Sequence, residues 1–325
     1  MMYYSMQNQK RGVISMTNFE INKTYIPKNI PEQIKFFDKK ISQLDVGKSG
    51  KNGFLKAEFE VNSLGESIVR NLYTEMPLHV QKSLLSKDDS GLSFMYIMSS
   101  SGGIIQGDRY KMEITMKKNS QAHITTQGAT RIYSMDSNWA SMWSKITLEE
   151  NSYLEYIPDQ IIPYKDSKFF QQTELIVDET ATAIYSEIVT PGRMAMNENF
   201  DFEICYLKTE INDKNGAKII LDISNMEPKK QEIKKFGIFG KYDILGSIYI
   251  VSNEKSILEL ESKISELLKT NKKIFGGLAI SNLNRGILVR ILGVETTSVR
   301  EVITEIVRIV RKKIINKDFY EIRKN

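Results

Sequence analysis

The segment 113-EITMKKNSQAHITT-126 decides the fold, because two similar segments follow it, 145-KITLEENSYLEYIP-158 and 174-ELIVDETATAIYSE-187. Neighbouring segments lie about thirty residues apart, a period typical of stacked repeats. Each segment predicts a strand, a tight turn and a second strand, because apolar and polar residues alternate with a period of two on both sides of the turn. One segment cannot bury its own apolar face, so we expect the three to stack.

Aligning the segments predicts which residues share the interior. The aligned columns are Ile114/Ile146/Leu175, Met116/Leu148/Val177, Ala122/Leu154/Ala183, Ile124/Tyr156/Tyr185 and Thr126/Pro158/Glu187. In this register Glu187 lies on the inward face, where a carboxylate is costly to bury unless it is paired, hydrated or bound to a cation. Arg193 is a candidate partner for a structural ion pair. Glu155 lies one position out of the column, and we expect it to be more easily solvated.

Composition places the chain among ordinary globular proteins. Its 325 residues are 41% hydrophobic and 26% charged, enough for one large domain or two small ones. No stretch approaches the roughly 20 apolar residues of a membrane span, and no export signal is evident, so we expect no membrane association. The only cysteine, Cys205, cannot form an internal disulfide, which favours a cytoplasmic location. The net charge of +5 is mild and spread out, which argues against nucleic-acid binding.

The chain divides into an extension and one domain. Residues 1–45 are polar and contain scattered lysines, so they predict a loosely held N-terminal extension. Residues 46–325 form the domain, with stacked β-coils over 46–225 and a mixed α/β part over 226–325. The mixed part predicts the order β-α-β-β-α, which favours helices packed on one face of a sheet. The predicted fold is therefore mainly β, a β-helix-like stack of strands with two C-terminal helices outside it.

Sequence signals set the expected limits of the two helices. A capping box of Ser256 and Glu259 predicts the start of a helix over residues 256–269. A second helix over 298–316 opens at Ser298, three residues before Glu301. Both carry an apolar stripe at helical spacing, so each is expected to bury one face.

Residues that could carry chemistry are few. His79 and His123 are the only histidines, and neither has a second His or Cys at ligand spacing, so we expect structural roles and no closed metal site. The glycine-rich loop 102-GGIIQGD-108 predicts a tight turn into the first coil. Its last residue, Asp108, either caps that turn by accepting hydrogen bonds from backbone amides or projects into an internal passage.

Several separated motifs resemble one family. They are Ser101–Asp108, Thr125–Tyr133, Leu154–Pro158 with Ile161–Pro163, Glu187–Arg193 and Leu288–Gly293. In order and spacing they are similar to the urease accessory protein UreD, also called UreH, from about Gly47 to the C-terminus. Two positions depart from the family pattern: Gln106 replaces a usual glycine, and Arg131 stands where a lysine is common.

The resemblance implies a non-enzymatic scaffold. Such proteins have a β-helix-like body, bind apo-urease, and recruit a helical UreF-type protein and a UreG-type GTPase that carries nickel. Nickel is expected to pass through a water-filled passage, with no cofactor tightly bound, because a tight His/Cys site would trap it. Asp108 and Glu187 match motif acids of the family and are the first candidates for transient nickel contacts. Glu155 and Glu198 are weaker candidates.

Two other classes of function remain open on the sequence. β-Helices also host carbohydrate-cleaving enzymes with paired carboxylates, and Asp108 with Glu187 is a candidate acid–base pair. The third class is a basic adaptor for acidic proteins with no metal role. Sugar release by the isolated protein would favour the enzyme, whereas urease activation that requires nickel and partners would favour the scaffold.

Overall fold

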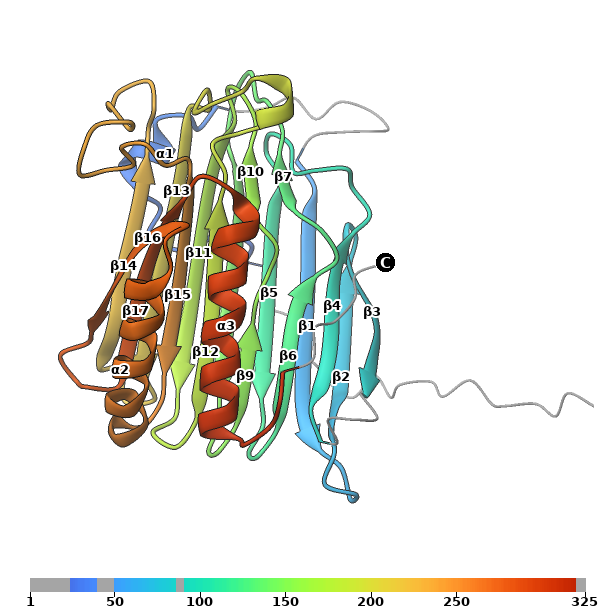
Figure 1. The fold of residues 1–325 in the computed structure, drawn as a ribbon. Helices are drawn as coiled ribbons and strands as arrows, with labels where there is room; N and C mark the ends of the chain where they lie inside the picture. The colour runs from blue at the N-terminus through green and yellow to red at the C-terminus, as the bar shows by residue number, and fades with distance from the viewer. Residues whose placement is uncertain (1–23, 40–49, 86–90, 320–325) are drawn as a thin grey trace, which may run out of the picture.

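The computed structural model describes residues 24–39, 50–85 and 91–319, which form two β-sheets that face each other (Figure 1). Sheet I contains, in spatial order, β14 (Lys218–Met226), β13 (Ile204–Asp213), β11 (Lys168–Val177), β8 (Ala140–Leu148), β5 (Arg109–Met116), β1 (Asn52–Val61) and β2 (Ser67–Glu75). Sheet II contains β16 (Ile274–Ile280), β17 (Gly286–Gly293), β15 (Ile244–Val251), β12 (Thr182–Val189), β9 (Tyr153–Tyr156), β6 (Gln121–Thr126), β4 (Ser93–Ser99) and β3 (Leu78–Leu85). The short strands β10 (Ile161–Pro163) and β7 (Thr130–Ile132) extend sheet II beside β12.

Each of the three similar segments crosses from sheet I to sheet II. β5, β8 and β11 are parallel neighbours in sheet I, and β6, β9 and β12 are parallel neighbours in sheet II. The register is the predicted one: Ile114 pairs with Ile146, and Ala122 pairs with Leu154. The predicted β-helix-like stack of strands is therefore confirmed.

Short polar residues make the turns between the sheets. Asn119 and Asn151 have φ angles of 62° and 54°, in the left-handed region that asparagine tolerates better than most residues. In the third segment the Asp178 carboxylate instead accepts a hydrogen bond from the Thr180 amide at 3.0 Å. These turns let each segment reverse from one sheet to the other.

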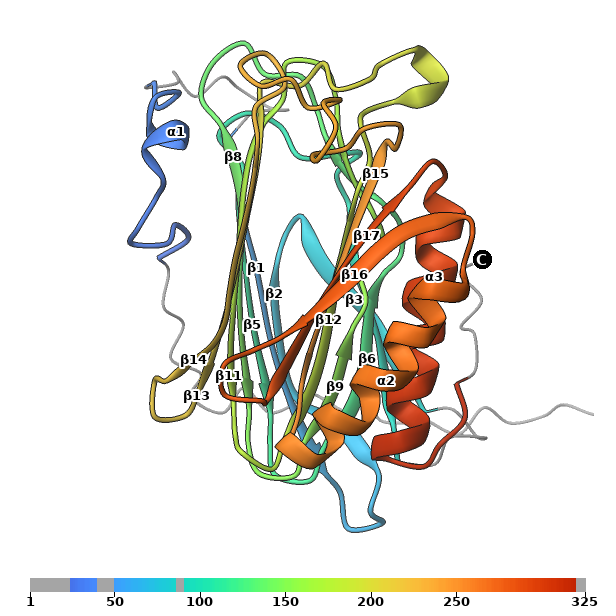
Figure 2. The ribbon, with the colours of Figure 1, turned by 60° about the vertical axis from the view of Figure 1, so that its left-hand side comes forward.

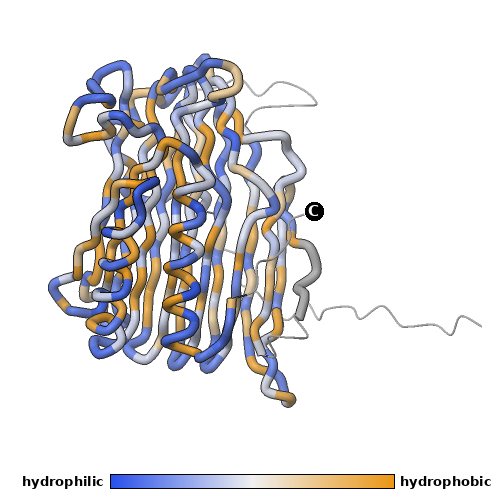
Figure 3. Tube along the Cα trace, in the orientation of Figure 1, coloured by the Kyte–Doolittle hydropathy of each residue, from blue (hydrophilic) through white to orange (hydrophobic). Residues whose placement is uncertain are grey.

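Alternation along the strands produces two cores. Hydrophobic and hydrophilic positions alternate along many strands (Figure 3). In β12, Ala183 and Tyr185 lie in the core between the sheets, whereas Ile184 and Ile188 lie in the core under the helices. Each large aliphatic side chain buried in this way contributes about 1.5–3 kcal/mol. Figure 2 shows the resulting layers: sheet I, sheet II, and then α2 (Glu254–Thr270) and α3 (Thr296–Ile314).

The C-terminal part follows the predicted order β15, α2, β16, β17, α3. The predicted helix starts are wrong. Asn253 caps α2, because its side-chain oxygen accepts a hydrogen bond from the Ser256 amide at 3.0 Å, so Ser256 lies inside the first turn. α3 begins at Thr296 without a side-chain cap, and Ser298 is buried within the helix.

Part of the N-terminal segment packs against sheet I. The sequence predicted a loosely held extension over residues 1–45, of which 24–39 are described. Here the short helix α1 (Glu32–Lys35) places Ile34, which is 0% exposed, against Trp139 and Phe170. Residues 24–39 therefore lie on the sheet instead of hanging loosely. The predicted boundary at residue 46 lies outside the described residues.

Candidate functional site

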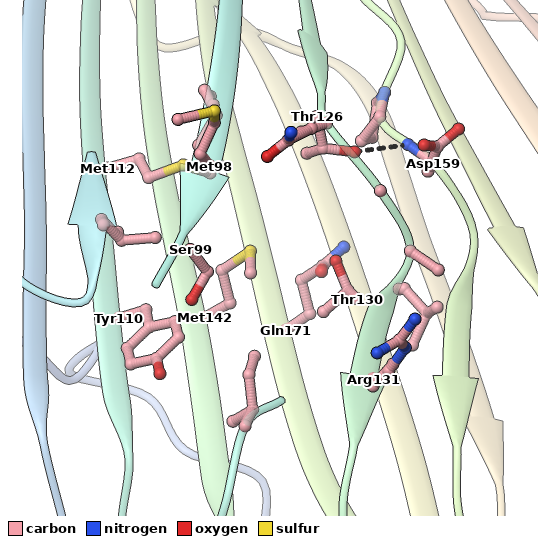
Figure 4. Close-up of a pocket in the computed structure, with 18 of the residues that line it drawn as sticks. Met98, Ser99, Tyr110, Met112, Thr126, Thr130, Arg131, Met142, Asp159 and Gln171 are labelled. Atoms are coloured by element: carbon pink, nitrogen blue, oxygen red, sulfur yellow. Dashed lines mark hydrogen bonds between the residues drawn. The ribbon is translucent and has the colours of Figure 1, made fainter. Parts of the chain in front are cut away.

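A cavity of about 400 Å³ lies between the two sheets. Met112, Met142 and Gln171 line it from sheet I, and Met98 and Tyr156 line it from sheet II. Figure 4 shows the three methionines and Gln171 around this space. The wall therefore mixes thioether, amide and hydroxyl groups, which are weak ligands for a divalent cation.

The glycine-rich loop forms one wall of the cavity. A Cβ on Gly103 would lie 2.6 Å from the Tyr133 ring and 2.8 Å from the Arg131 carbonyl oxygen, so only glycine fits this close approach. Exposed Ser99 and Arg131 lie among the lining residues. The cavity is thus reached from the surface beside Ser99 and Arg131.

Glu187 lies in the inner wall of the cavity, on the inward face that the sequence predicted. It is 4% exposed. Its Oε1 accepts hydrogen bonds from the Tyr185 hydroxyl at 2.6 Å and the Gln171 amide at 2.8 Å. Burial raises the pKa of Glu187, although these two hydrogen bonds oppose the rise. The carboxylate is therefore held in place without a cationic group in direct contact among the described residues.

Sequence reasoning missed most of the groups around Glu187. The inward position of Gln171 could have been read from the alternation in β11. The Tyr249 hydroxyl lies 3.3 Å from Glu187 Oε2. Tyr249 belongs to β15, which pairs with β12 in an antiparallel arrangement, and the three repeated segments do not predict this pairing. Partners that arise from such pairing need the tertiary structure.

The predicted partner of Glu187, Arg193, pairs with a different acid. At Gly192, with φ of 142°, the chain turns out of β12, and Arg193 forms an ion pair with Glu198 and lies 4.2 Å from the centre of the Tyr164 ring. The hydrogen bond from Arg193 lowers the pKa of Glu198. The prediction that Arg193 forms an ion pair with Glu187 is therefore wrong. Glu198 is not among the residues that line the cavity.

Asp108 caps the turn at the end of the glycine-rich loop. It is 0% exposed, and its carboxylate accepts hydrogen bonds from the Lys51 amide at 2.9 Å and the Ile105 amide at 3.1 Å. The Tyr110 hydroxyl, which lines the cavity, donates to it at 3.2 Å. Burial raises the pKa of Asp108, and the two amides oppose the rise. Of the two alternatives, this geometry is that of the turn cap.

Glu155 is fully buried, so the prediction that it is easily solvated is wrong. It points away from the cavity, toward α3, whose Arg311 donates to it at 2.8 and 2.5 Å. His123 Nδ1 lies 2.6 Å from the same carboxylate. The alternation correctly placed Glu155 on the opposite face, but α3 covers that face. The three residues form a buried ionic cluster with the structural role predicted for His123.

The described residues form no closed metal centre, and of the predicted acid pair Asp108 and Glu187 only Glu187 lines the cavity. Within residues 24–39, 50–85 and 91–319, no group of three or more His, Cys, Asp or Glu side chains could hold a metal ion. Asp108 is not a lining residue and uses both carboxylate oxygens in hydrogen bonds, whereas Glu187 lies in the cavity wall. This arrangement disfavours Asp108 and Glu187 as the acid–base pair of a carbohydrate-cleaving enzyme, because that mechanism needs both acids at one substrate.

The helices give no sign of a membrane segment: in the described part of the chain, none combines the length and apolar character needed to cross a bilayer.

Comparisons with known proteins agree with the motifs. The chain matches the UreD urease accessory protein family over residues 51–324. Urease accessory protein UreD of Cenarchaeum symbiosum is 35% identical over 285 residues, covering 87% of this chain and 100% of the relative. Urease accessory protein UreD 2 of Brucella canis is 35% identical over 275 residues, covering 84% and 91%. UreD 3 of Methylorubrum populi is 33% identical over 290 residues, covering 87% and 92%. The chain therefore belongs to the UreD family of urease accessory proteins.

Proposed function

We propose that this protein is a scaffold for urease maturation that guides nickel through the cavity between its sheets. In this proposal it binds apo-urease together with a UreF-type helical protein and a UreG-type GTPase. Membership of the UreD family supports the role in urease maturation. The observation that supports nickel guidance is a buried carboxylate, Glu187, in the wall of an internal cavity.

The oxygen-containing side chains of the cavity wall suit a nickel ion that binds and is then released. Carboxylate, amide and hydroxyl oxygens bind Ni²⁺ more weakly than histidine or thiolate groups do. Two carboxylates line the cavity, Asp159 and Glu187. Asp159 forms an ion pair with Arg300 at 2.9 Å, whereas Gln171 and Tyr185 hold Glu187 in a fixed position by hydrogen bonds. Because these oxygen ligands are weak, nickel would stay only briefly at Glu187.

The proposal also assigns a non-catalytic role to the protein. The relatives are named accessory proteins. The glycine-rich loop and Glu187 act in this account on the cargo without making or breaking a covalent bond. The acids Asp108, Glu155 and Glu198 then support the fold around the passage: a turn cap, an anchor for α3 and a clamp on the chain after β12.

Replacing Glu187 by Gln tests this function. The variant keeps the shape and the hydrogen bonds to the carbonyl oxygen but loses the charge, so it should fold and bind partners while nickel incorporation into urease falls by about tenfold or more. Glu210→Gln is the matched control, because Glu210 pairs with Lys208 on the outer side of sheet I. Nickel per urease active site, measured by metal analysis after reconstitution with all partners, is the readout. Full incorporation by a partner-bound E187Q protein would contradict the proposal.

A further inference from the structure

A row of polar residues leads from Glu187 across the interior to the edge of the molecule. In sheet II, Glu187 pairs with Ser247 of β15, and Ser247 pairs with Arg290 of β17, so the three side chains follow one another on the same face. In sheet I, Thr209 of β13 pairs with Asp222 of β14. We call Glu187, Ser247, Arg290, Thr209 and Asp222 the polar belt. The surrounding core between the sheets is largely apolar, and burying polar groups in it costs free energy unless they are paired.

The belt is linked by direct contacts. The Tyr249 hydroxyl lies between the two carboxylates, 2.6 Å from Asp222 Oδ2 and 3.3 Å from Glu187 Oε2. The negative charge of Asp222 is among the causes that raise the pKa of Glu187. The two acids are therefore electrostatically coupled, although β12 and β14 belong to different sheets.

Arg290 closes the outer end of the belt. Its guanidinium donates to both oxygens of Asp222 at 2.6 Å and to the Ser247 hydroxyl at 2.8 Å. The Arg290 side chain is 33% exposed and that of Asp222 is 13% exposed, so the ion pair lies where the belt reaches solvent. β14 and β17 are near each other at this edge of the two sheets (Figure 2). Gly286 of β17 fits closely there, since an added Cβ would lie 2.9 Å from Ile220.

We propose that Asp222 is a second, outer binding position for the divalent cation, and that Arg290 occupies it as an exchangeable countercharge. The proposal rests on the proposed function, because it extends the path of the cargo beyond Glu187. A cation that moves along the belt replaces the guanidinium at Asp222, and the exposed arginine side chain turns into solvent. In this proposal the path of the cation continues from Glu187 along the belt to the edge formed by β14 and β17.

A purely structural ion pair is the competing explanation, and it makes a different prediction. If Arg290 only ties β17 to β14, its loss destabilises the protein and creates no new ligand affinity. If Asp222 is a cation position, loss of the guanidinium leaves two coupled carboxylates that attract a divalent cation. Neighbouring charges change the affinity of a carboxylate for a proton by roughly 10- to 1000-fold. We expect removal of the guanidinium to raise the affinity of the two carboxylates for a divalent cation in the same direction.

Nickel binding by the full chain tests the proposal. Isothermal titration calorimetry with NiCl2 should show binding about tenfold or more tighter for R290M and R290Q than for the unaltered protein. Adding Asp222→Asn to either variant should remove the gain, and R290K should behave like the unaltered protein. R308M is the matched control, because Arg308 forms an exposed ion pair with Glu305 on α3, remote from the belt.

Failure of the proposal is distinguishable from failure of the proposed function. Folded R290M or R290Q that binds nickel no more tightly than the unaltered protein overturns the belt position, whatever Glu187 does in urease activation. A gain that persists in the D222N double variants also overturns it, because the cation would then bind elsewhere. A gain that D222N removes supports the belt, even if the separate reconstitution with E187Q contradicts nickel guidance.

Discussion

Removing the charge of Glu155 should destabilise the protein strongly, although Glu155 was expected to be solvated. The side chains of Glu155 and Arg311 are both 0% exposed, and Arg311 donates to both carboxylate oxygens. Glu155→Gln leaves the guanidinium buried without its counterion. The cluster also joins α3 to β6 and β9, so we expect the helix to loosen from sheet II when it is broken.

The size of the loss follows from the pairing of Glu155 with Arg311 and His123. Burial would raise the pKa of Glu155, but hydrogen bonds from Arg311 and His123 lower it from 4.5 to about 2. A difference of that size corresponds to about 3 kcal/mol of stability. Removing one partner of a buried ion pair generally costs about 3–5 kcal/mol. For a protein of this size, 3 kcal/mol lowers the melting temperature by roughly 5 °C.

Thermal unfolding followed by circular dichroism measures the loss. E150Q is the control, because Glu150 pairs with Lys118 at the surface and its side chain is 53% exposed. The folded-state pKa of Glu155 is depressed, so its contribution is complete above about pH 4.5 and is lost as the pH falls toward about 2. The gap between the unaltered protein and E155Q should therefore be constant from pH 7 to about 4.5 and shrink below. An E155Q protein that melts within about 1 °C of the control would refute a buried ionic cluster.

Three further predictions concern the packing of side chains and backbone elsewhere in the fold and in the glycine-rich loop. Ile34→Ala removes a fully buried side chain at a cost of roughly 2–4 kcal/mol and should speed proteolysis within residues 24–39, as mass spectrometry of the fragments will show. Gly103→Ala should cost about 1–3 kcal/mol in urea unfolding because of the contact with Tyr133, whereas Gly128→Ala, with no atom within 4 Å of the added Cβ, should be neutral. Cys205 is buried, which raises the pKa of its thiol, so maleimide should label it only in denaturant; labelling of the folded protein would contradict its placement.

The repeat made much of the fold predictable. Period-two alternation places Ala122 and Leu154 in one column, and the stack follows because no segment can bury that column by itself. Edges and caps were less predictable. β3 (Leu78–Leu85) lacks clear alternation and pairs only with β4 among the described strands, so its place at the edge of sheet II has no signal in the sequence. Asn253 precedes Ser256 and supplies the cap first, a competition that the capping-box pattern does not resolve.

The sequence predicts the face of the strand on which each acidic side chain lies, but not the residues that contact it. Alternation placed Glu187 inward and Glu155 outward, as the structure has them. What covers the outer face depends on α3, more than a hundred residues later in the sequence, and its Arg311 turns Glu155 into a buried ion. Arg193 is close to Glu187 in sequence, but the turn at Gly192 directs it to Glu198. Long-range packing, which leaves no periodic signal, decides the contact of Glu155, and a local turn decides that of Arg193.

Blocking the cavity at its surface tests its use by nickel most directly. Ser99 is exposed and lines the cavity (Figure 4), and the only natural cysteine, Cys205, is fully buried. Ser99→Cys can therefore be labelled selectively with a bulky thiosulfonate, with a methyl thiosulfonate as the small control. We predict that the bulky label stops nickel transfer to apo-urease while partner binding persists, and that reduction with dithiothreitol restores transfer. Undiminished nickel transfer by the fully labelled, partner-bound protein would contradict passage through the cavity.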